Sequence, residues 1–396
     1  MISWAENRLP KSVCDLSPFD LPTVEKVRAF HRSFPQYAVT PLASLDNLAA
    51  ALGVGGIYVK DESPRFGLNS FKALGCTFAL AHFIANAIGR PVWELNYQTL
   101  PQAARQLGAF TFYAATDGNH GRAVAWAARE LGQKAVVFMN KGCPQVRLEH
   151  IRREGAQASI SDLNYDDTIR MAAALAAETP NSAIVQDTAW EGYEDIPRTI
   201  MQGYAVMALE ALEQMRDLGL RPTHLLLQAG VGAFAGAAQA LVANFCGPNA
   251  PVSFVVEPAA ADCYRRSVLR GDGIPAAVRG EMATIMAGLA CGEPSSISWE
   301  ILKNHSRYFA AIEDSHAAQG MRILGAPLPG DPRVISGESG AASMGFLAQL
   351  LTNPDLAALR RQAGIDGNSR ILLFSTEGDT DPENYRRVVW DGLYAQ

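Results

Sequence analysis

The chain has 396 residues, of which 48% are hydrophobic and 19% charged, and its formal net charge is −6 at pH 7. This length allows one large or two ordinary domains with buried cores, and the composition is typical of a soluble globular protein. Because the charge balance is acidic and no basic tract occurs, a nucleic-acid partner is not expected.

The N-terminal segment predicts no targeting sequence and one helix. Its first residues carry Glu6, Asp15 and Asp20 but no apolar block, so a signal peptide is not expected. An apolar helix is predicted over Leu45 to Leu52, after the sequence Thr40 to Leu42.

A lysine at a helix start marks the next segment. The apolar run Gly56 to Lys60 predicts a strand, and a turn-rich segment follows it. An alanine-rich helix is predicted over Ala73 to Ile88, with Asn69 or Ser70 as its N-cap. Lys72 therefore lies in the first helical turn, where the helix dipole disfavours a cation.

Two roles are open for Lys72. If the amine is desolvated, the field of the helix terminus lowers its pKa and leaves a nucleophile, which can bind an aldehyde cofactor as a Schiff base. The alternative is a surface lysine whose stem covers apolar surface, and sequence position alone does not exclude it.

Strands and helices alternate along the rest of the chain. The predicted strands are 110–115, 135–139, 157–160, 184–186, 223–227, 252–256 and 371–374. Helices of roughly 15 residues separate most of them, which is the signature of βαβ units and of a parallel sheet. The fold class is therefore α/β. The predicted lobes are a large one, 1–75 and 185–396, and a small one, 76–184, with boundaries uncertain by about ten residues.

A glycine-rich turn, Gly230 to Gly236, lies between a predicted strand and a predicted helix. Small residues there allow backbone N–H groups to converge on an anion, and a cofactor phosphate is one candidate. A dinucleotide is another, because the glycine spacing approximates the Rossmann fingerprint and Glu257 ends the next strand. Close packing of helix on strand, without a ligand, is the third interpretation.

The segment Thr116 to Gly121 predicts a second anion site, because it is a polar, glycine-containing turn between a strand and a helix. A carboxylate beside a bound anion is repelled by it. Asp117 therefore implies either a substrate that brings an extra cation or a catalytic base. The structural alternative is that Asp117 caps the following helix. We expect His120 to form structural hydrogen bonds rather than to catalyse.

Two further polar segments follow predicted strands. Asp187 ends one strand, and Ser375 to Gly378 follows the last one. Side chains at the carboxyl ends of parallel strands face the crevice where ligands bind. Asp187 is thus a candidate active-site residue, with a turn or N-cap aspartate as the alternative.

The sequence around Lys72 resembles that of a known family. The motifs that carry the resemblance are Lys60 to Ser63, Arg65 to Asn69 and Phe71-Lys72. They are similar to those of the diaminopropionate ammonia-lyases, which are fold-type II (tryptophan-synthase-β-like) pyridoxal-phosphate enzymes. Similar motifs run in order from about Thr40 to Trp390. The resemblance implies a two-lobed α/β fold, with parallel sheets flanked by helices and pyridoxal 5'-phosphate in the cleft.

The resemblance also implies roles for individual residues. It implies that Lys72 binds the cofactor and that Asp187 is catalytic and handles the substrate amines. The other implied cofactor-binding residues are Asn119, Gly230, Val231, Gly232, Ala233, Phe234, and Ser375 or Thr376 at the pyridine nitrogen. The implied substrate-binding residues are Thr116, Asp117, Gly118, His120 and Asp187. Fold-type II enzymes usually have a small neutral residue where this chain has Asp117, and no metal is implied.

The implied reaction is an α,β-elimination of 2,3-diaminopropionate, via aminoacrylate, to pyruvate and two ammonia molecules. Lys72 lies on one face of the cofactor and can take the Cα proton from one enantiomer, whereas Asp117 on the other face would serve the other. Both isomers are therefore predicted to react, Lys72 serving L and Asp117 serving D. The alternatives are a serine or threonine dehydratase of the same fold and, more remotely, an NAD-dependent dehydrogenase using Glu257.

An amino-acid substrate and, from the resemblance, a second copy in a homodimer are the expected partners. No membrane association is expected, because the longest uncharged stretch, Leu225 to Phe245, contains glutamines and glycines. The six cysteines form no C-x-x-C pair, which fits a reducing cytoplasm without a zinc site. Whether Cys263 and Cys291 pair stays open.

Overall fold

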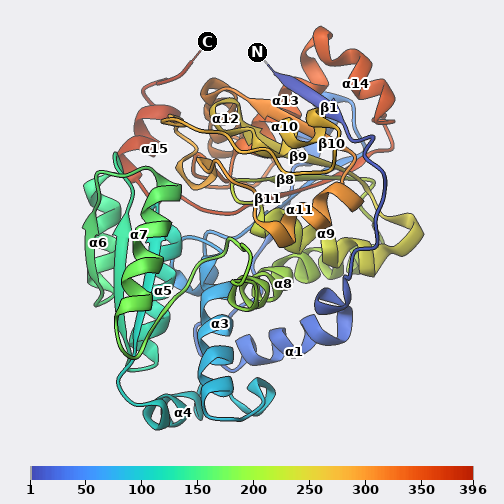
Figure 1. The fold of residues 1–396 in the computed structure, drawn as a ribbon. Coiled ribbons are helices and arrows are strands. Elements are labelled where there is room, and N and C mark those ends of the chain that lie inside the picture. The colour runs from blue at the N-terminus through green and yellow to red at the C-terminus, as the bar shows by residue number, and fades with distance from the viewer. Residues whose placement is uncertain (1, 396) are drawn as a thin grey trace.

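The computed structural model describes residues 2–395 and divides their strands between two sheets (Figure 1). The larger sheet has seven strands in the order β1-β10-β9-β8-β11-β3-β2. These strands are β1 (Ser3–Glu6), β2 (Leu42–Ser44), β3 (Gly56–Asp61), β8 (His224–Gln228), β9 (Val252–Pro258), β10 (Tyr308–Ile312) and β11 (Arg370–Ser375). The five central strands run parallel, and the edge strands β1 and β2 are antiparallel to their neighbours.

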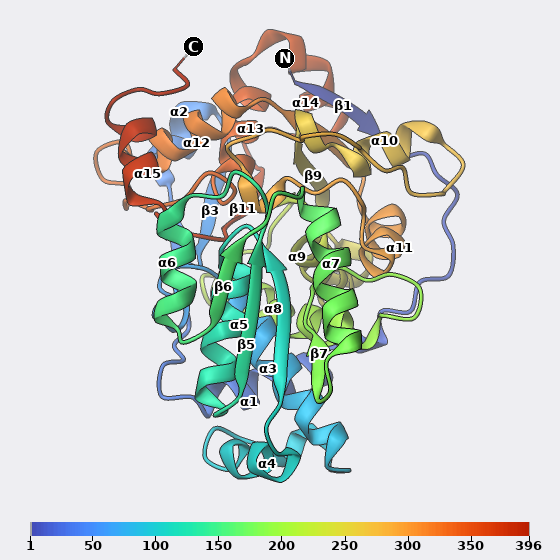
Figure 2. The ribbon, with the colours of Figure 1, turned by 60° about the vertical axis from the view of Figure 1, so that its left-hand side comes forward.

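The smaller sheet has four parallel strands in the order β6-β5-β4-β7. They are β4 (Thr111–Thr116), β5 (Lys134–Met139), β6 (Gln157–Ile160) and β7 (Ser182–Ile184). Figure 2 shows helix α7 in front of this sheet and α5 behind it, and both helices pack on β4. The predicted α/β class with parallel sheets between helices is confirmed. The boundaries proposed for the two lobes stay a prediction.

Fifteen α-helices occur within residues 2–395. They are α1 (Leu21–Arg32), α2 (Asp46–Leu52), α3 (Lys72–Ala87), α4 (Leu100–Leu107), α5 (Asn119–Glu130), α6 (Gln145–Arg153), α7 (Tyr165–Glu178), α8 (Asp195–Asp217), α9 (Ala233–Cys246), α10 (Cys263–Arg270), α11 (Ser296–His305), α12 (Asp314–Gly325), α13 (Ala342–Thr352), α14 (Ala357–Gln362) and α15 (Pro382–Val389). Among these described helices, none combines the length and the apolar character that a membrane crossing requires.

The larger sheet is buried on both faces because its central strands are apolar at nearly every position. In β8, Leu225 and Leu227 belong to one core, which also contains residues of α3, α8 and α9. Leu226 points the other way, into a second core with residues of α12 and α13. Successive side chains of a strand point to opposite faces, so a continuous apolar run produces a sheet covered on both sides.

Three local features differ from the sequence predictions. Phe71 occupies the N-cap position of α3 without a side-chain hydrogen bond, so neither Asn69 nor Ser70 caps the helix. Asn69 instead adopts a φ of 59° and its amide donates to Asp379. The strand predicted at 184–186 is Ser182–Ile184, so Asp187 lies in the loop beyond the strand.

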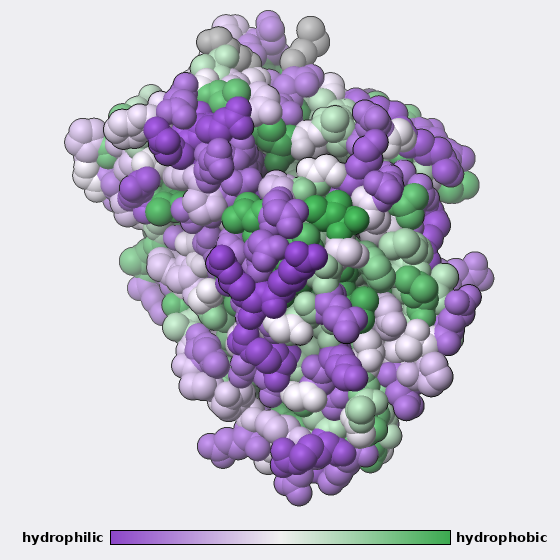
Figure 3. Space-filling view, turned by 90° about the vertical axis from the view of Figure 1, so that its left-hand side faces the viewer, coloured by the Kyte–Doolittle hydropathy of each residue, from purple (hydrophilic) through white to green (hydrophobic). Residues whose placement is uncertain are grey.

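The loops that carry the candidate site residues leave the carboxyl ends of strands from both sheets. These strands are β3, β4, β7, β8 and β11. The site is therefore assembled where the two sheets face each other. On the outer face beside α6, apolar residues form small groups among hydrophilic ones (Figure 3).

Candidate active site

A buried ionic network holds the loop that carries Lys72. In that loop, Arg65 donates to Glu62 at 2.8 Å and to Glu210 of α8 at 2.7 Å. Lys60 of β3 lies 2.8 Å from the same Glu210 oxygen. All four side chains are fully buried. Because buried charges must be paired, these contacts tie the loop to β3 and α8.

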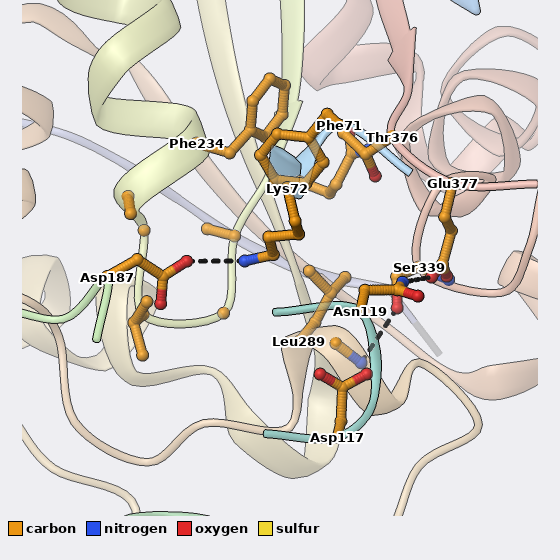
Figure 4. A pocket seen from close by; sticks show the side chains of 17 residues that line it. Phe71, Lys72, Asp117, Asn119, Asp187, Phe234, Leu289, Ser339, Thr376 and Glu377 are labelled. Atoms are coloured by element: carbon orange, nitrogen blue, oxygen red, sulfur yellow. Dashed lines mark hydrogen bonds and ion pairs between the residues drawn. The ribbon is translucent and has the colours of Figure 1, made fainter. Parts of the chain in front are cut away.

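Lys72 is the first residue of α3, and its amine forms an ion pair (Figure 4). Its Nζ lies 2.6 Å from Oδ2 of Asp187, and the Tyr204 hydroxyl donates to the same oxygen at 3.0 Å. Burial acts to lower the pKa of Lys72, but the Asp187 carboxylate outweighs it and the pKa is raised. The predicted lowering of this pKa by the helix terminus is therefore wrong, because the prediction lacked the carboxylate partner.

Asp187 keeps its charge although it is buried. Burial acts to raise its pKa, but the Lys72 amine outweighs that effect, and the pKa falls to about 2. His120 and the Tyr204 hydroxyl add to the lowering. Asp187 is thus an ionised carboxylate in direct contact with the lysine amine.

Asp117 lines the same cavity and does not cap a helix. The N-cap residue of α5 is Gly118, with a φ of 150°, which has no side chain that could cap the helix. Thr116 Oγ1 accepts the N–H groups of Gly118 and Gly121 at 2.8 and 3.0 Å. The carboxylate of Asp117 instead accepts a hydrogen bond from Arg147 at 3.2 Å. The capping alternative for Asp117 is therefore wrong.

Not every residue predicted to bind substrate lies in the cavity wall. Asp117 and Asp187 line it, as does Asn119, which was predicted to bind the cofactor, whereas Thr116, Gly118 and His120 are not among the lining residues. His120 is buried and its ring nitrogens face the Val185 carbonyl oxygen at 2.8 Å and the Cys76 sulfur at 3.6 Å. This placement matches the expectation that His120 forms structural hydrogen bonds.

The glycine-rich turn leads from β8 into α9. Gly232, with a φ of 89°, occupies the N-cap position, and the helix begins at Ala233. The Tyr264 hydroxyl donates to the Val231 carbonyl oxygen at 2.6 Å and supports the turn from behind. Within residues 2–395, the backbone N–H groups of 230–234 have no hydrogen-bond acceptor. These free donors at a helix N-terminus form an anion-binding cradle.

Glu257 does not face this turn as a ribose-binding residue would. Its carboxylate accepts the backbone N–H groups of Tyr264 and Arg265 at 2.7 and 2.8 Å, at the start of α10. Burial raises its pKa to about 8. The dinucleotide interpretation is wrong, because the acidic residue on which it depends is used to cap a helix.

The segment after β11 presents one hydroxyl to the cavity. Thr376 lines the wall, and its Oγ1 accepts a hydrogen bond from Gln228 at 2.9 Å. Ser375 is fully buried and donates to Ser336 at 2.8 Å. All six cysteines are free, so Cys263 and Cys291 do not form a disulfide here.

Several wall residues were given no role in the sequence analysis. Glu377 lines the cavity, accepts the Ser339 N–H at 3.0 Å and binds the Asn119 amide. Burial raises its pKa to about 7. Gly288 and Leu289 line the wall from the segment 283–294, where the only signal was the family resemblance. Arg147, behind Asp117, had no distinguishing signal among the arginines of its helix.

The residues fit pyridoxal 5'-phosphate. One cavity is lined by both the Lys72 side chain and the 230–234 cradle. Pyridoxal phosphate requires an amine for its aldehyde and donors for its phosphate, and this cavity supplies both.

The parallel α/β fold, the lysine that lines the cavity and the phosphate cradle define a pyridoxal-phosphate-dependent enzyme. The family model described as pyridoxal-phosphate dependent enzyme matches residues 34–376. A diaminopropionate ammonia-lyase of Salmonella typhimurium is 48% identical over 374 residues, which is 93% of this chain and 92% of the relative. One from Escherichia coli K12 is 49% identical over 368 residues, 93% and 91% of the two chains.

A solved structure is similar along the whole chain. It is the Escherichia coli diaminopropionate ammonia lyase in complex with D-serine, with a TM-score of 0.93 and 45% identity. The match covers 100% of this chain and 98% of that one. The chain belongs to the diaminopropionate ammonia-lyase family of pyridoxal-phosphate-dependent enzymes.

Proposed function

We propose that this enzyme converts 2,3-diaminopropionate and water to pyruvate and two ammonia molecules, and that it accepts both the D and the L isomer. The observation that carries the proposal is that two carboxylates, Asp117 and Asp187, line the cavity that holds the Lys72 amine. A diamine substrate brings one more cation than an ordinary amino acid does, and a cavity lined by these carboxylates favours that extra charge.

The roles proposed for the cofactor site follow the geometry. Lys72 binds the aldehyde, and the N–H groups of 230–234 bind the phosphate. Asn119 would contact the ring hydroxyl, and Thr376, which lines the wall, would contact the ring nitrogen in preference to Ser375. When bound, the cofactor withdraws electrons from the substrate Cα and so makes its proton acidic.

The chain's own residues then bind the substrate and move its protons. The Thr116–Gly121 loop holds the substrate carboxylate, and Asp187 holds the β-ammonium group. Lys72 removes the Cα proton of the L isomer, and Asp117 removes that of the D isomer. A base must lie within hydrogen-bond reach of the proton that it takes, so each isomer requires the base on its own side.

A serine or threonine dehydratase is the second candidate, because its substrates bind to the same kind of cofactor. A β-hydroxyl group cannot compensate the charge of Asp187 as a β-ammonium group does, and an uncompensated buried charge is unfavourable. We therefore expect much faster release of pyruvate from diaminopropionate than from serine. Pyruvate, 2-oxobutyrate and ammonia release from D- and L-diaminopropionate, serine and threonine tests this; equal or faster turnover of serine or threonine would refute the proposed substrate.

The division of labour between the two bases is tested by Asp117→Asn. This variant is expected to lose D-isomer activity by about 10²- to 10⁴-fold, the usual contribution of a general base, and to retain most L-isomer activity. The measurement is kcat/KM for each isomer, with cofactor absorbance as a control for loading. Equal losses on both isomers would contradict the proposed roles.

We also propose that the enzyme is a cytoplasmic homodimer. The six free cysteines support a reducing compartment. The dimer is supported by the family to which the chain belongs, and light scattering of the purified enzyme would determine its oligomeric state.

A further inference from the structure

Arg147 is a buried cation that lies behind the cavity wall. It projects from α6, and 5% of its side chain is exposed. Its stem packs against Gly118, where an added Cβ atom would lie 2.9 Å from the arginine Cδ. Because Gly118 also has a φ of 150°, any other residue there would be strained and would displace Arg147.

Carboxylates from separate elements surround the guanidinium. Nη1 of Arg147 donates to Oδ2 of Asp117 at 3.2 Å, and Nη2 lies 3.5 Å from Oε2 of Glu338, which precedes α13. Glu377 also interacts electrostatically with the guanidinium. One positive charge is thus shared among three buried carboxylates. Within residues 2–395, no hydrogen bond or ion pair involves Oδ1 of Asp117, and Asp117 lines the cavity.

Without Arg147, Asp117 would lie among like charges. The remaining cation near it is Lys72, which is already paired with another carboxylate. Burial and neighbouring carboxylates both raise a carboxyl pKa. Glu377 shows both effects. Burial raises its pKa to about 7, and the neighbouring carboxylates Glu338 and Asp117 add to the increase, although Arg147 opposes it.

The other titratable groups that face Asp117 cannot replace this cation. They are His120, Cys143, Tyr165 and Cys291. Burial lowers the pKa of His120 and raises the pKa of both thiols and of the phenol. All four groups are therefore neutral near pH 7 to 8.

We propose that Arg147 is a positioning residue that sets its positive charge against one oxygen of Asp117 and leaves the other oxygen for the cavity, so that turnover of the D isomer depends on it. This inference rests on the proposed role of Asp117. Arg147 acts through that carboxylate and does not itself contact the substrate.

The test is the pH dependence of kcat/KM for each isomer in Arg147→Gln, compared with the unmodified holoenzyme. Removing the cation is expected to move the acid limb of the D-isomer profile to higher pH by about one to three units. This is the usual effect of one opposite charge in contact with a carboxylate. The acid limb for the L isomer is expected to stay in place. Arg147→Lys retains the positive charge but loses the planar guanidinium that contacts two carboxylates at once, so it is expected to give a smaller shift of the acid limb.

A control variant removes another arginine that forms an ion pair with a carboxylate far along the chain. Arg170 of α7 pairs with Glu293 at 2.6 Å, and Glu293, unlike Asp117, does not line the cavity. Arg170→Gln is expected to leave both acid limbs unchanged. Glu338→Gln, which removes a competing carboxylate, is expected to move the D-isomer limb downward and tests the inference even where Arg147→Gln does not fold. Thermal unfolding and cofactor absorbance establish folding and loading for every variant.

Three results would overturn the inference. The first is an unmoved D-isomer acid limb in folded Arg147→Gln, and the second is an equal shift for both isomers. The third is an equal rise in KM for both isomers, which would make Arg147 a binder of the substrate carboxylate. If Asp117→Asn is not selective for the D isomer, the proposed base assignment fails as well. If it is selective but Arg147→Gln is not, only the role of Arg147 fails.

Discussion

Lys72 and Asp187 form an ion pair in which each group displaces the pKa of the other. The pKa of Asp187 lies at about 2, below its ordinary value, so its contribution to stability is complete above that ordinary value and is lost as the pH falls through about 2. The pKa of Lys72 is raised, so its contribution is complete below the ordinary lysine value and is lost as the pH rises beyond it. In the absence of the cofactor, both groups are therefore charged throughout the neutral range.

Asp187→Asn tests the proposal that the Asp187 carboxylate binds the β-ammonium group of the substrate. Losing a hydrogen bond between charged groups is worth about 1.5–3 kcal/mol, so kcat/KM for both diaminopropionate isomers is expected to fall by about 10- to 100-fold. Tyr204→Phe removes the hydroxyl that donates to Asp187 and leaves the carboxylate, so it is expected to have a smaller effect. Unchanged kinetics in Asp187→Asn would show that the carboxylate does not bind the substrate.

At the scale of elements, the helix that carries Lys72 is placed by close packing on α8. A Cβ atom at Gly203 of α8 would lie 2.2 Å from the Leu74 carbonyl oxygen, and one at Gly75 of α3 would lie 2.5 Å from the Tyr204 ring. The two backbones therefore approach each other closely because both positions lack a side chain. Tyr204, which follows Gly203, reaches Asp187 from the same helix.

Gly203→Ala tests this packing. The added methyl group has no space against the α3 backbone, and overpacking usually costs about 1–3 kcal/mol of unfolding free energy. We expect denaturant unfolding to show a loss of that size and the cofactor absorbance band to weaken, since α3 carries Lys72. Gly367→Ala is the control, because nothing lies within 4 Å of its added Cβ atom. Equal stability of the two variants would contradict the packing argument.

Sequence patterns predicted individual elements well where apolar periodicity and turns were clear. The predicted bounds of the strand 157–160 coincide with those of β6. The edge strand Ser3–Glu6 was not predicted, because a four-residue strand depends on its partner β10 rather than on its own pattern. The N-cap residue of α3 was wrongly predicted for a similar reason: buried tertiary contacts, rather than a capping side chain, hold the preceding loop.

At the scale of the whole molecule, the site depends on loops from both sheets. Its candidate residues were predictable one by one, because each follows the carboxyl end of a strand or begins a helix. The contacts that these residues make with one another were not predictable from the sequence. Lys72 and Asp187 are 115 positions apart, and Asn119 and Glu377 are 258 apart, so these contacts arise only from the tertiary fold. Arg147 was missed for the same reason, because only folding places it behind Asp117.

The account depends most on Lys72 as the residue that binds the cofactor, and reductive trapping measures this directly. Borohydride reduces the bond between a lysine and a bound aldehyde to a stable amine, and mass spectrometry of the digested holoenzyme then locates the label. We expect the label on Lys72 and none on Lys60, which is fully buried in its ion pair with Glu210. Lys72→Ala is expected to carry no label. A label on any other lysine of the unmodified enzyme, or its absence from Lys72, would contradict the account.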